Sequence, residues 1–203
     1  NGSDYSATLL ARGLEAEEVT IWTGVSGVMT ADPEIVHDAY PLPRMSYMEA
    51  LELATFGARM FHPRTMIPLM ESGIPLRIRS TFDPEAEGTR VDESGQPDAD
   101  RPTSVTSLER LALIDIQVRR LDAKARVSER VQRALDAAGL PVWLGTQSAH
   151  GQALSAVVPG ASAERARAAV QAELRAEIDA HDINPVGVAQ PVTLLTLVAE
   201  AMG

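Results

Sequence analysis

Residues 18–33, EVTIWTGVSGVMTADP, are the stretch that decides the fold of this chain. The stretch opens with β-branched and apolar residues, which predict a strand over 18–23 with Val19 and Ile21 buried. Two glycines then punctuate a loop, and glycine lets a ligand come close to the backbone. A strand that delivers such a loop suits a nucleotide pocket, although the same pattern serves any tight loop.

Helices and strands are expected on both sides of this stretch. A helix is predicted over residues 4–14, and residues 24–45, with two glycines and three prolines, are expected to be mostly loop. Ser46 and Glu49 form a capping-box pattern that opens the next helix. The apolar face expected for that helix comprises Tyr47, Leu51, Ala54, Ala58 and Phe61, and Pro63 should end it. A shorter helix ending at Gly73 and a strand in IPLRIR, residues 74–79, follow.

The second half has a different rhythm. Residues 92–104 hold two prolines, one glycine and four acids, so they are expected to form a solvated linker. Strands are predicted at 111–118, 141–146, 153–158 and 185–189, with helices at 127–138, ended by Gly139, and at 163–178, capped by Ser162. The order β-α-β-β-α-β is that of the ferredoxin-like fold. Residues 192–202, VTLLTLVAEAM, are expected to begin a further unit.

The composition excludes several kinds of partner and site. The chain has 203 residues, enough for one large or two small domains, and a formal net charge of −10, which argues against nucleic acid or an anionic membrane as partner. Cysteine is absent, which excludes disulfides and thiolate metal sites and fits a reducing, cytoplasmic location. No apolar run approaches the roughly 20 residues of a membrane helix. The abrupt ends, NGSDYS and AEAMG, favour a fragment of a longer protein.

Two further motifs have both a functional and an ordinary interpretation. Asn1-Gly2-Ser3-Asp4 precedes a helix, where backbone N–H groups form an anion site, but an ordinary N-cap is the simpler interpretation. FGARMFHPRT, residues 56–65, places Arg59 and His62 at a helix end, and His62 is more often a structural histidine bonded to a turn. The sequence has no Ser-His-Asp arrangement, no metal-ligand spacing and no Walker-type lysine loop.

In combination these motifs are far more specific. Residues 1–91 resemble an aspartokinase through NGSDYSA, IWTGVSGVMTADPEIV, MSYMEALELATFGARMFHPRT and IPLRIRSTFDPEAEGTRV, and most of all the bifunctional aspartokinase–homoserine dehydrogenases. Residues 105–190 resemble the ACT regulatory region of those enzymes more loosely, most clearly in LPVWLGTQSAHGQALSAVVP.

The resemblance implies an α/β fold in four parts. Residues 1–91 would be the C-terminal part of an amino-acid kinase α/β sandwich, and residues 92–104 a linker. Residues 105–190 would form a ferredoxin-like ACT domain, and residues 191–203 would start a second ACT-like unit.

The resemblance also implies a reaction. ATP, with Mg²⁺, would phosphorylate L-aspartate to 4-phospho-L-aspartate, the first step toward lysine, threonine and methionine. NADP would be used only if a homoserine dehydrogenase follows in the same protein. Threonine or lysine would act as an end-product effector, and ACT units would join copies of the chain in a homo-oligomer.

The resemblance assigns residues to that reaction one motif at a time. Ser3 and Asp4 would be catalytic, beside the transferred phosphate, with Gly2 and Ser3 at the aspartate. The residues along the nucleotide would be Thr23, Gly24, Gly27, Met29, Asp32, Arg59 and Met60. Gln147 would contact the effector amino acid.

Several positions depart from the family pattern. Gly24 stands where the family has an aspartate, Met29 where it has a tyrosine, Glu34 where it has an arginine, and Arg59 where it has a lysine. We therefore expect weakened nucleotide affinity. In the second half, RRLDAKARV, residues 119–127, replaces a glycine-rich loop, so threonine control is expected to be weak or absent.

One family motif is missing from the sequence. The Lys-Phe-Gly-Gly phosphate motif of aspartokinases does not occur, so the fragment alone is expected to be inactive. The alternative function is a non-catalytic amino-acid-binding or oligomerisation module of the ACT type. A different amino-acid kinase, such as a glutamate or uridylate kinase, is disfavoured by FGARMFHPRT and the ACT-like tail.

Overall fold

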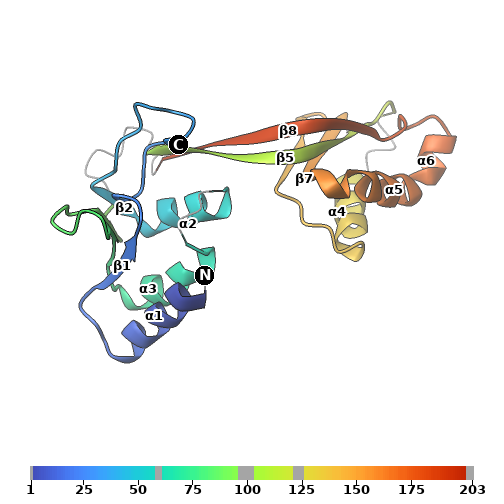
Figure 1. The fold of residues 1–203 in the computed structure, drawn as a ribbon. Helices are drawn as coiled ribbons and strands as arrows, with labels where there is room; N and C mark the ends of the chain where they lie inside the picture. Colours follow the sequence, from blue (N-terminus) through green and yellow to red (C-terminus); the bar gives the residue numbers. More distant parts are fainter. Residues whose placement is uncertain (1, 58–60, 96–102, 121–125, 200–203) are drawn as a thin grey trace. The chain divides into compact units, whose positions relative to one another are not determined.

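The computed structural model describes residues 2–57, 61–95, 103–120 and 126–199. The chain divides into two compact units (Figure 1). The first consists of Asn1–Ser107 together with Leu195–Gly203, and the second of Leu108–Leu194. Each unit has a hydrophobic core of its own.

A mixed four-stranded sheet forms the frame of the first unit. Its strands are β1 (Val19–Thr23), β2 (Arg44–Ser46), β3 (Leu76–Ser80) and β4 (Thr89–Asp92), in the spatial order β1-β3-β4-β2. The strand β1 runs parallel to β3, and β2 runs parallel to β4, whereas β3 and β4 are antiparallel. The carboxyl ends of β1 and β3 therefore meet at one edge of the sheet.

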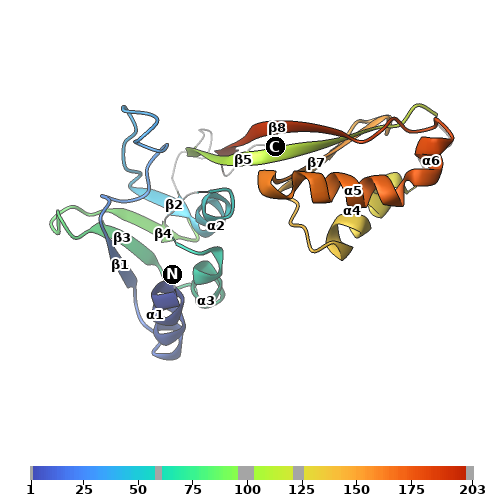
Figure 2. The ribbon, with the colours of Figure 1, turned by 45° about the vertical axis from the view of Figure 1, so that its right-hand side comes forward.

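Three helices cover one face of this sheet (Figure 2). They are α1 (Gly2–Gly13), α2 (Tyr47–Thr55) and α3 (Met66–Ser72), the last preceded by the 3₁₀ turn η1 (Pro63–Thr65). Leu76 and Ile78 of β3 face the helices and are buried, as period-two alternation predicts. The fully buried side chains of this core include Met45, Leu53, Met66, Leu69 and Leu76.

The helix caps predicted for α2 and α3 are confirmed. Ser46 accepts a hydrogen bond from the Glu49 N–H at 3.2 Å, and the Glu49 carboxylate accepts one from the Ser46 N–H at 2.7 Å. Gly73 ends α3 in the left-handed conformation, with φ 65°. His62 accepts a hydrogen bond from the Arg64 N–H at 3.2 Å, so it caps a turn as a structural histidine does.

The predicted end of α2 is wrong. The helix stops at Thr55, eight residues before Pro63, because Gly57 adopts φ 117° and takes the backbone out of helical geometry. The predicted apolar face is confirmed in the described residues: Tyr47 and Phe61 are buried, and Leu51 and Ala54 are half-buried and pack against the core. Ala50 and Leu53, which were not predicted, are buried as well. Ala58, also expected on that face, lies outside the described residues.

The ends of the predicted linker are ordered parts of the first unit. Asp92 closes β4, and Thr103 and Ser104 are buried and hydrogen-bonded. Polarity indicated solvent exposure here, but these polar side chains have partners inside the fold, which offsets the cost of burial. Residues 96–102 lie outside the described residues.

The second unit has the predicted β-α-β-β-α-β order. Its strands are β5 (Ser104–Gln117), β6 (Leu144–Gln147), β7 (Ala153–Pro159) and β8 (Gly187–Val198), in the spatial order β6-β7-β5-β8. The part of β5 before Leu108 and the part of β8 after Leu194 belong to the first unit. Its helices are α4 (Val127–Ala137), α5 (Ala163–Glu173) and α6 (Arg175–Asp179), with the 3₁₀ turn η3 (Gly160–Ser162) before α5. Leu135, Val170, Leu174, Ile114 and Ile116 are among the residues at its core.

Four details of the second unit differ from prediction. Ser162 makes no side-chain cap bond, and the expected long helix breaks at Leu174 into α5 and α6. Strand β6 begins at Leu144 rather than near Pro141, and all of its residues are exposed. Residues 187–198 form one strand, whereas a short strand and a separate new unit were expected.

Candidate functional site

The glycine-punctuated loop, residues 24–33, leaves the sheet at the carboxyl end of β1. The Thr23 carbonyl accepts hydrogen bonds from the Thr81 N–H at 2.8 Å and the Thr81 hydroxyl at 3.2 Å. These bonds extend the parallel pairing of β1 and β3 one step beyond Ser80. Ligands of α/β proteins commonly bind beyond the carboxyl ends of parallel strands, so the loop lies at a suitable edge.

The middle of this loop is firmly anchored. The Val28 N–H donates to the Thr89 hydroxyl at 2.8 Å, and that hydroxyl donates to the Leu42 carbonyl at 2.6 Å. The Leu42 N–H donates in turn to the Val28 carbonyl at 2.7 Å, and the Thr30 N–H donates to the Tyr40 carbonyl at 3.0 Å. Residues 28–30 are thus paired with residues 40–42 and fixed to β4.

Gly27 is required by this anchoring. Its φ is 141°, which L side chains rarely adopt, and an added Cβ would lie 2.5 Å from the Thr89 hydroxyl oxygen. Gly24 has no such constraint, because an added Cβ would make only an ordinary contact, 3.6 Å from Phe82 Cε2. The two glycines of the motif therefore play different parts.

Beyond the anchored base, the tip of the loop is solvent-exposed. The Asp32 carboxylate accepts a hydrogen bond from the Glu34 N–H at 2.9 Å, and the Asp32 carbonyl accepts from the N–H of Val36 at 2.8 Å. These bonds fold a turn at Asp-Pro-Glu. Asp32, Glu34 and Asp38 give the tip a negative charge, so a phosphate bound there needs cations from a metal ion or other side chains.

An exposed aromatic pair stands beside the strand ends. Trp22 is 47% exposed, and the guanidinium carbon of Arg79 lies 4.9 Å from its ring centroid, a cation–π distance. Phe82 follows β3 and is 85% exposed. Arg79 is held by the carbonyls of Ala86, at 3.1 Å, and Pro84. Sequence patterns did not single out this group.

The predicted aspartate-side residues lie at the start of α1. Gly2 and Ser3 are exposed and Asp4 is half-buried, and the Ser3 hydroxyl donates to the Asp4 carboxylate at 3.3 Å. The Gly2 carbonyl accepts a hydrogen bond from the Ser6 hydroxyl at 2.9 Å.

The structure brings only part of the predicted set together. Thr23, Gly24, Gly27, Met29 and Asp32 share one loop and the strand end that precedes it. Gln147 is exposed on β6, in the second unit, opposite Leu154 of β7. Arg59 and Met60 lie outside the described residues, as do residues 121–125 of the segment expected to impair threonine control.

The face of the first sheet opposite the helices carries an ion-pair network. Asp92 accepts hydrogen bonds from Arg44 and Arg90, both at 2.8 Å. Glu18 links Arg90 at 3.1 Å to Arg77 at 3.0 Å. Burial opposes ionisation of Asp92, but the hydrogen bonds from Arg90, Arg44 and Ser94 prevail and lower its pKa from 3.8 to about 2.

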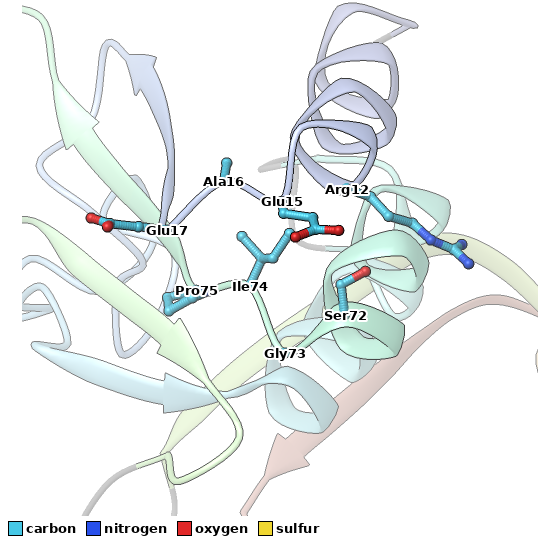
Figure 3. A pocket seen from close by; sticks show the side chains of 8 residues that line it. All are labelled: Arg12, Glu15, Ala16, Glu17, Ser72, Gly73, Ile74 and Pro75. Carbon is cyan, nitrogen blue, oxygen red and sulfur yellow. The ribbon is translucent and has the colours of Figure 1, made fainter.

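A shallow hollow of about 600 Å³ lies at the opposite ends of β1 and β3 (Figure 3). It is bordered by the ends of α1 and α3 and by the residues that lead into the two strands. Its lining comprises Arg12, Glu15, Ala16, Glu17, Ser72, Gly73, Ile74 and Pro75. None of the predicted site residues is among them, so this hollow is separate from the glycine loop.

We find neither a cluster of metal ligands nor a membrane-spanning helix among the described residues. In the described parts of the chain, no group of three or more His, Cys, Asp or Glu side chains is placed to hold a metal ion. No helix among the described residues is long and apolar enough to cross a membrane.

Sequence reasoning missed two residues that shape the loop. Thr89 fixes Val28 and excludes a side chain at position 27, and Ser104 contacts the carbonyls of Met29 and Thr30. Thr89 lies within a stretch that carried the family resemblance, so a signal existed there. Ser104 was placed in the linker, and its polarity gave no sign of a buried role.

Comparison with known proteins agrees with the resemblance. Residues 1–80 match the family model described as the amino acid kinase family. The bifunctional aspartokinase/homoserine dehydrogenase of Haemophilus influenzae is 38% identical over 202 residues, which cover 100% of this chain and 25% of that protein. The chain spans about a quarter or less of the length of these curated relatives.

Solved aspartate kinases have the same fold. The Clostridium acetobutylicum enzyme matches with a TM-score of 0.84 and 22% identity, over 97% of this chain and 45% of that chain. E. coli aspartokinase III in complex with lysine and aspartate matches with a TM-score of 0.75 and 29% identity, over 98% of this chain and 43% of that chain. The same enzyme in complex with aspartate and ADP matches with a TM-score of 0.73 and 27% identity, over 100% and 45%.

These matches support less than the full prediction. The family model ends at residue 80, so it shows neither that this part is the second half of a kinase domain nor that residues 105–190 are an ACT domain. Both assignments stay predictions, as do the roles of the individual site residues. What the sequence matches and the fold establish together is that the chain is α/β and similar to aspartokinases over its whole length, and that its residues 1–80 match the amino acid kinase family.

Proposed function

We propose that this chain is part of an aspartokinase and that the loop of residues 24–33 lines its ATP site. The observation that carries the proposal is the construction of the loop: an anchored base at residues 27–30 and an exposed tip, at the carboxyl edge of two parallel strands. The E. coli relative crystallised with aspartate and ADP supports the same substrates. The reaction is transfer of the terminal phosphoryl group of ATP to the side-chain carboxylate of L-aspartate.

The proposal gives each predicted site residue a role. The backbone of Thr23, Gly24, Gly27 and Met29 approaches the nucleotide, and Asp32 shapes the turn at the tip. Gly2, Ser3 and Asp4 lie at the aspartate and the transferred phosphoryl group. Mg²⁺ needs only one or two protein carboxylates besides phosphate oxygens, and the half-buried Asp4 carboxylate is of the right type. We propose that Arg59 and Met60 also lie along the nucleotide.

Gly24 offers the sharpest test, because the aspartokinase pattern that this sequence resembles implies an aspartate there. The backbone accepts a side chain at this position without a close contact. In the intact enzyme, Gly24→Asp should lower the KM for Mg-ATP about tenfold, the value of one charge-assisted hydrogen bond. Gly24→Ala is the matched control and should leave this KM unchanged.

The outcomes of this test are distinct. Phosphorylation of aspartate by the intact enzyme, with tighter ATP binding only in Gly24→Asp, supports the proposal. An intact enzyme that does not phosphorylate aspartate overturns it. Residues 1–203 alone are expected to be inactive, because the Lys-Phe-Gly-Gly motif is not in this sequence. Turnover by that segment contradicts this part of the proposal.

The second unit supports a second candidate function, a non-catalytic ACT-type module that binds an amino acid or joins copies of the chain. Its β-α-β-β-α-β order and its separate core favour this assignment. The outer face of its sheet has an apolar hollow of about 150 Å³ lined by Leu113, Val157, Val192, Thr193 and Leu194.

Thermal melting of the intact protein with threonine, lysine and methionine tests this module. A ligand that binds only the folded protein raises its melting temperature. We expect a weak or absent response to threonine, and Gln147→Ala should abolish any response to a bound effector. A shift that survives Gln147→Ala argues against a role for Gln147. Sedimentation of the same samples reports whether copies associate.

A further inference from the structure

The first residues of β5 contact the glycine loop on the side away from residues 40–42. The Ser104 hydroxyl lies 2.9 Å from the Met29 carbonyl oxygen and 3.1 Å from that of Thr30. The Val105 N–H donates to the Thr30 carbonyl at 2.8 Å. Residues 29–30 are therefore held from both sides, by residues 40–42 and by β5.

The hydrogen bond from Ser104 matters mainly for one atom, the Met29 carbonyl oxygen. A hydroxyl has one proton, so the two carbonyls share it. Thr30 keeps the bond from Val105 if the hydroxyl is removed, but the Met29 carbonyl loses the hydrogen bond that this hydroxyl gives it. Ser104 is only 4% exposed, so water is a poor substitute as a donor.

The strand end that carries Ser104 is itself fixed. The neighbouring Thr103 N–H donates to the Val198 carbonyl at 2.8 Å, and the Thr103 hydroxyl donates to the Glu49 carboxylate. The other oxygen of Glu49 accepts the Ser46 N–H in the capping box of α2. The position of Ser104 is thus set by the start of α2 and the end of β8, both independent of the loop.

We infer that Ser104 is a positioning residue for the nucleotide loop: its hydroxyl holds the Met29 backbone in the position needed to bind ATP. The inference rests on the proposed function of residues 24–33. It adds that nucleotide affinity depends on where β5 begins, because a shift of this strand along its axis would move the hydroxyl past the two carbonyls.

The experiment compares three variants of the intact enzyme. Ser104→Ala removes the hydroxyl, Ser104→Thr keeps it, and Ser94→Ala removes a hydroxyl that bonds Asp92 instead of the loop. We expect Ser104→Ala to raise the KM for Mg-ATP about five- to tenfold. The kcat and the KM for L-aspartate should stay within about twofold, since the hydroxyl touches neither substrate. Ser104→Thr and Ser94→Ala should resemble the wild type.

Hydrogen exchange of a peptide covering residues 28–36 provides a readout that does not need turnover. In Ser104→Ala this peptide should exchange faster, while peptides of α1 should be unchanged. Faster exchange without a change in the ATP KM shows that Ser104 holds the loop but does not position it for ATP, which overturns the inference. Equal rises in both KM values with a large fall in melting temperature would mark a general structural role and also overturn it. A wild-type enzyme without aspartokinase activity is a separate result, because it refutes the proposed function and the inference with it.

Discussion

Gly27 shows how one residue can fix a loop. With φ at 141° and the Thr89 hydroxyl 2.5 Å from the place of a Cβ, no side chain fits without movement of the backbone. Gly27→Ala should destabilise the first unit by about 1–3 kcal/mol and loosen the loop. Gly13→Ala is the control: nothing lies within 4 Å of its Cβ position and it ends α1, so its effect should be small. Urea unfolding measures both, and equal effects would contradict the steric explanation.

Asp92 gives the first unit a pH dependence whose sign is fixed. Its pKa is about 2 in the folded protein against 3.8 in the unfolded chain, so its stabilisation is complete above about pH 5 and disappears as the pH falls toward 2. The contribution should stay below about 2 kcal/mol, because the side chains of Arg44 and Arg90 are 39% and 35% exposed and solvent screens them.

The corresponding prediction uses Asp92→Asn. At pH 7 the variant should be less stable than the wild type, and the difference should shrink steadily between pH 5 and pH 2.5. Urea unfolding at several pH values measures this difference. A constant gap across that range would mean that the carboxylate charge contributes nothing. Arg167→Gln serves as the control, because its partner Glu164 is 68% exposed and the pair should contribute little at any pH.

At the scale of elements, two serines before helices test what a cap contributes. Ser46 is 3% exposed and makes a complete capping box with Glu49, whereas Ser162 precedes α5 without a side-chain cap bond. Ser46→Ala should cost about 1–2 kcal/mol of unfolding free energy, and Ser162→Ala less than about 0.5. Thermal or urea unfolding of the two variants decides, and a larger loss for Ser162→Ala would contradict the structure.

The same pair shows how far the sequence can predict elements. Both serines stand before an apolar face with helical spacing, but only Ser46 is followed three residues later by a glutamate, so the capping-box pattern separates them. The break of the second helix at Leu174 coincides with a tertiary contact: Arg130 of α4 bonds the Glu173 carboxylate at 2.8 Å and the Glu173 carbonyl at 2.6 Å, and it also pairs with Glu177. Such a contact spans 43 residues and leaves no local signal.

The candidate site could likewise be predicted only in part from the sequence. The strand and its glycine loop came from the sequence, because β-branched residues and glycines act locally. The anchoring of that loop by Thr89 and Ser104 did not, because the two residues lie 61 and 75 positions from their partners Val28 and Met29. The linker ends are polar, but their polar side chains are buried with hydrogen-bond partners and are not exposed to solvent as predicted.

At the scale of the whole chain, the two units have separate cores, and this separation has a consequence for unfolding. No buried residue belongs to both hydrophobic clusters of the described residues. Unfolding of a chain of this kind need not follow a two-state transition. The two tryptophans are placed to report each unit alone, because Trp22 belongs to the first and Trp143 to the second.

Leu69 and Leu135 are matched core residues for testing this separation, both fully buried, one in each cluster. Each change to alanine should cost about 2–5 kcal/mol in its own unit, through lost burial and a residual cavity. Leu69→Ala should therefore shift the transition seen by Trp22 in a Trp143→Phe background and leave that of Trp143 unchanged in a Trp22→Phe background. Leu135→Ala should do the reverse. Denaturant unfolding followed by fluorescence measures all four combinations. If either leucine variant shifts both transitions equally, the units unfold as one, and the stability of the glycine loop is then set by the whole chain and not by the first unit alone.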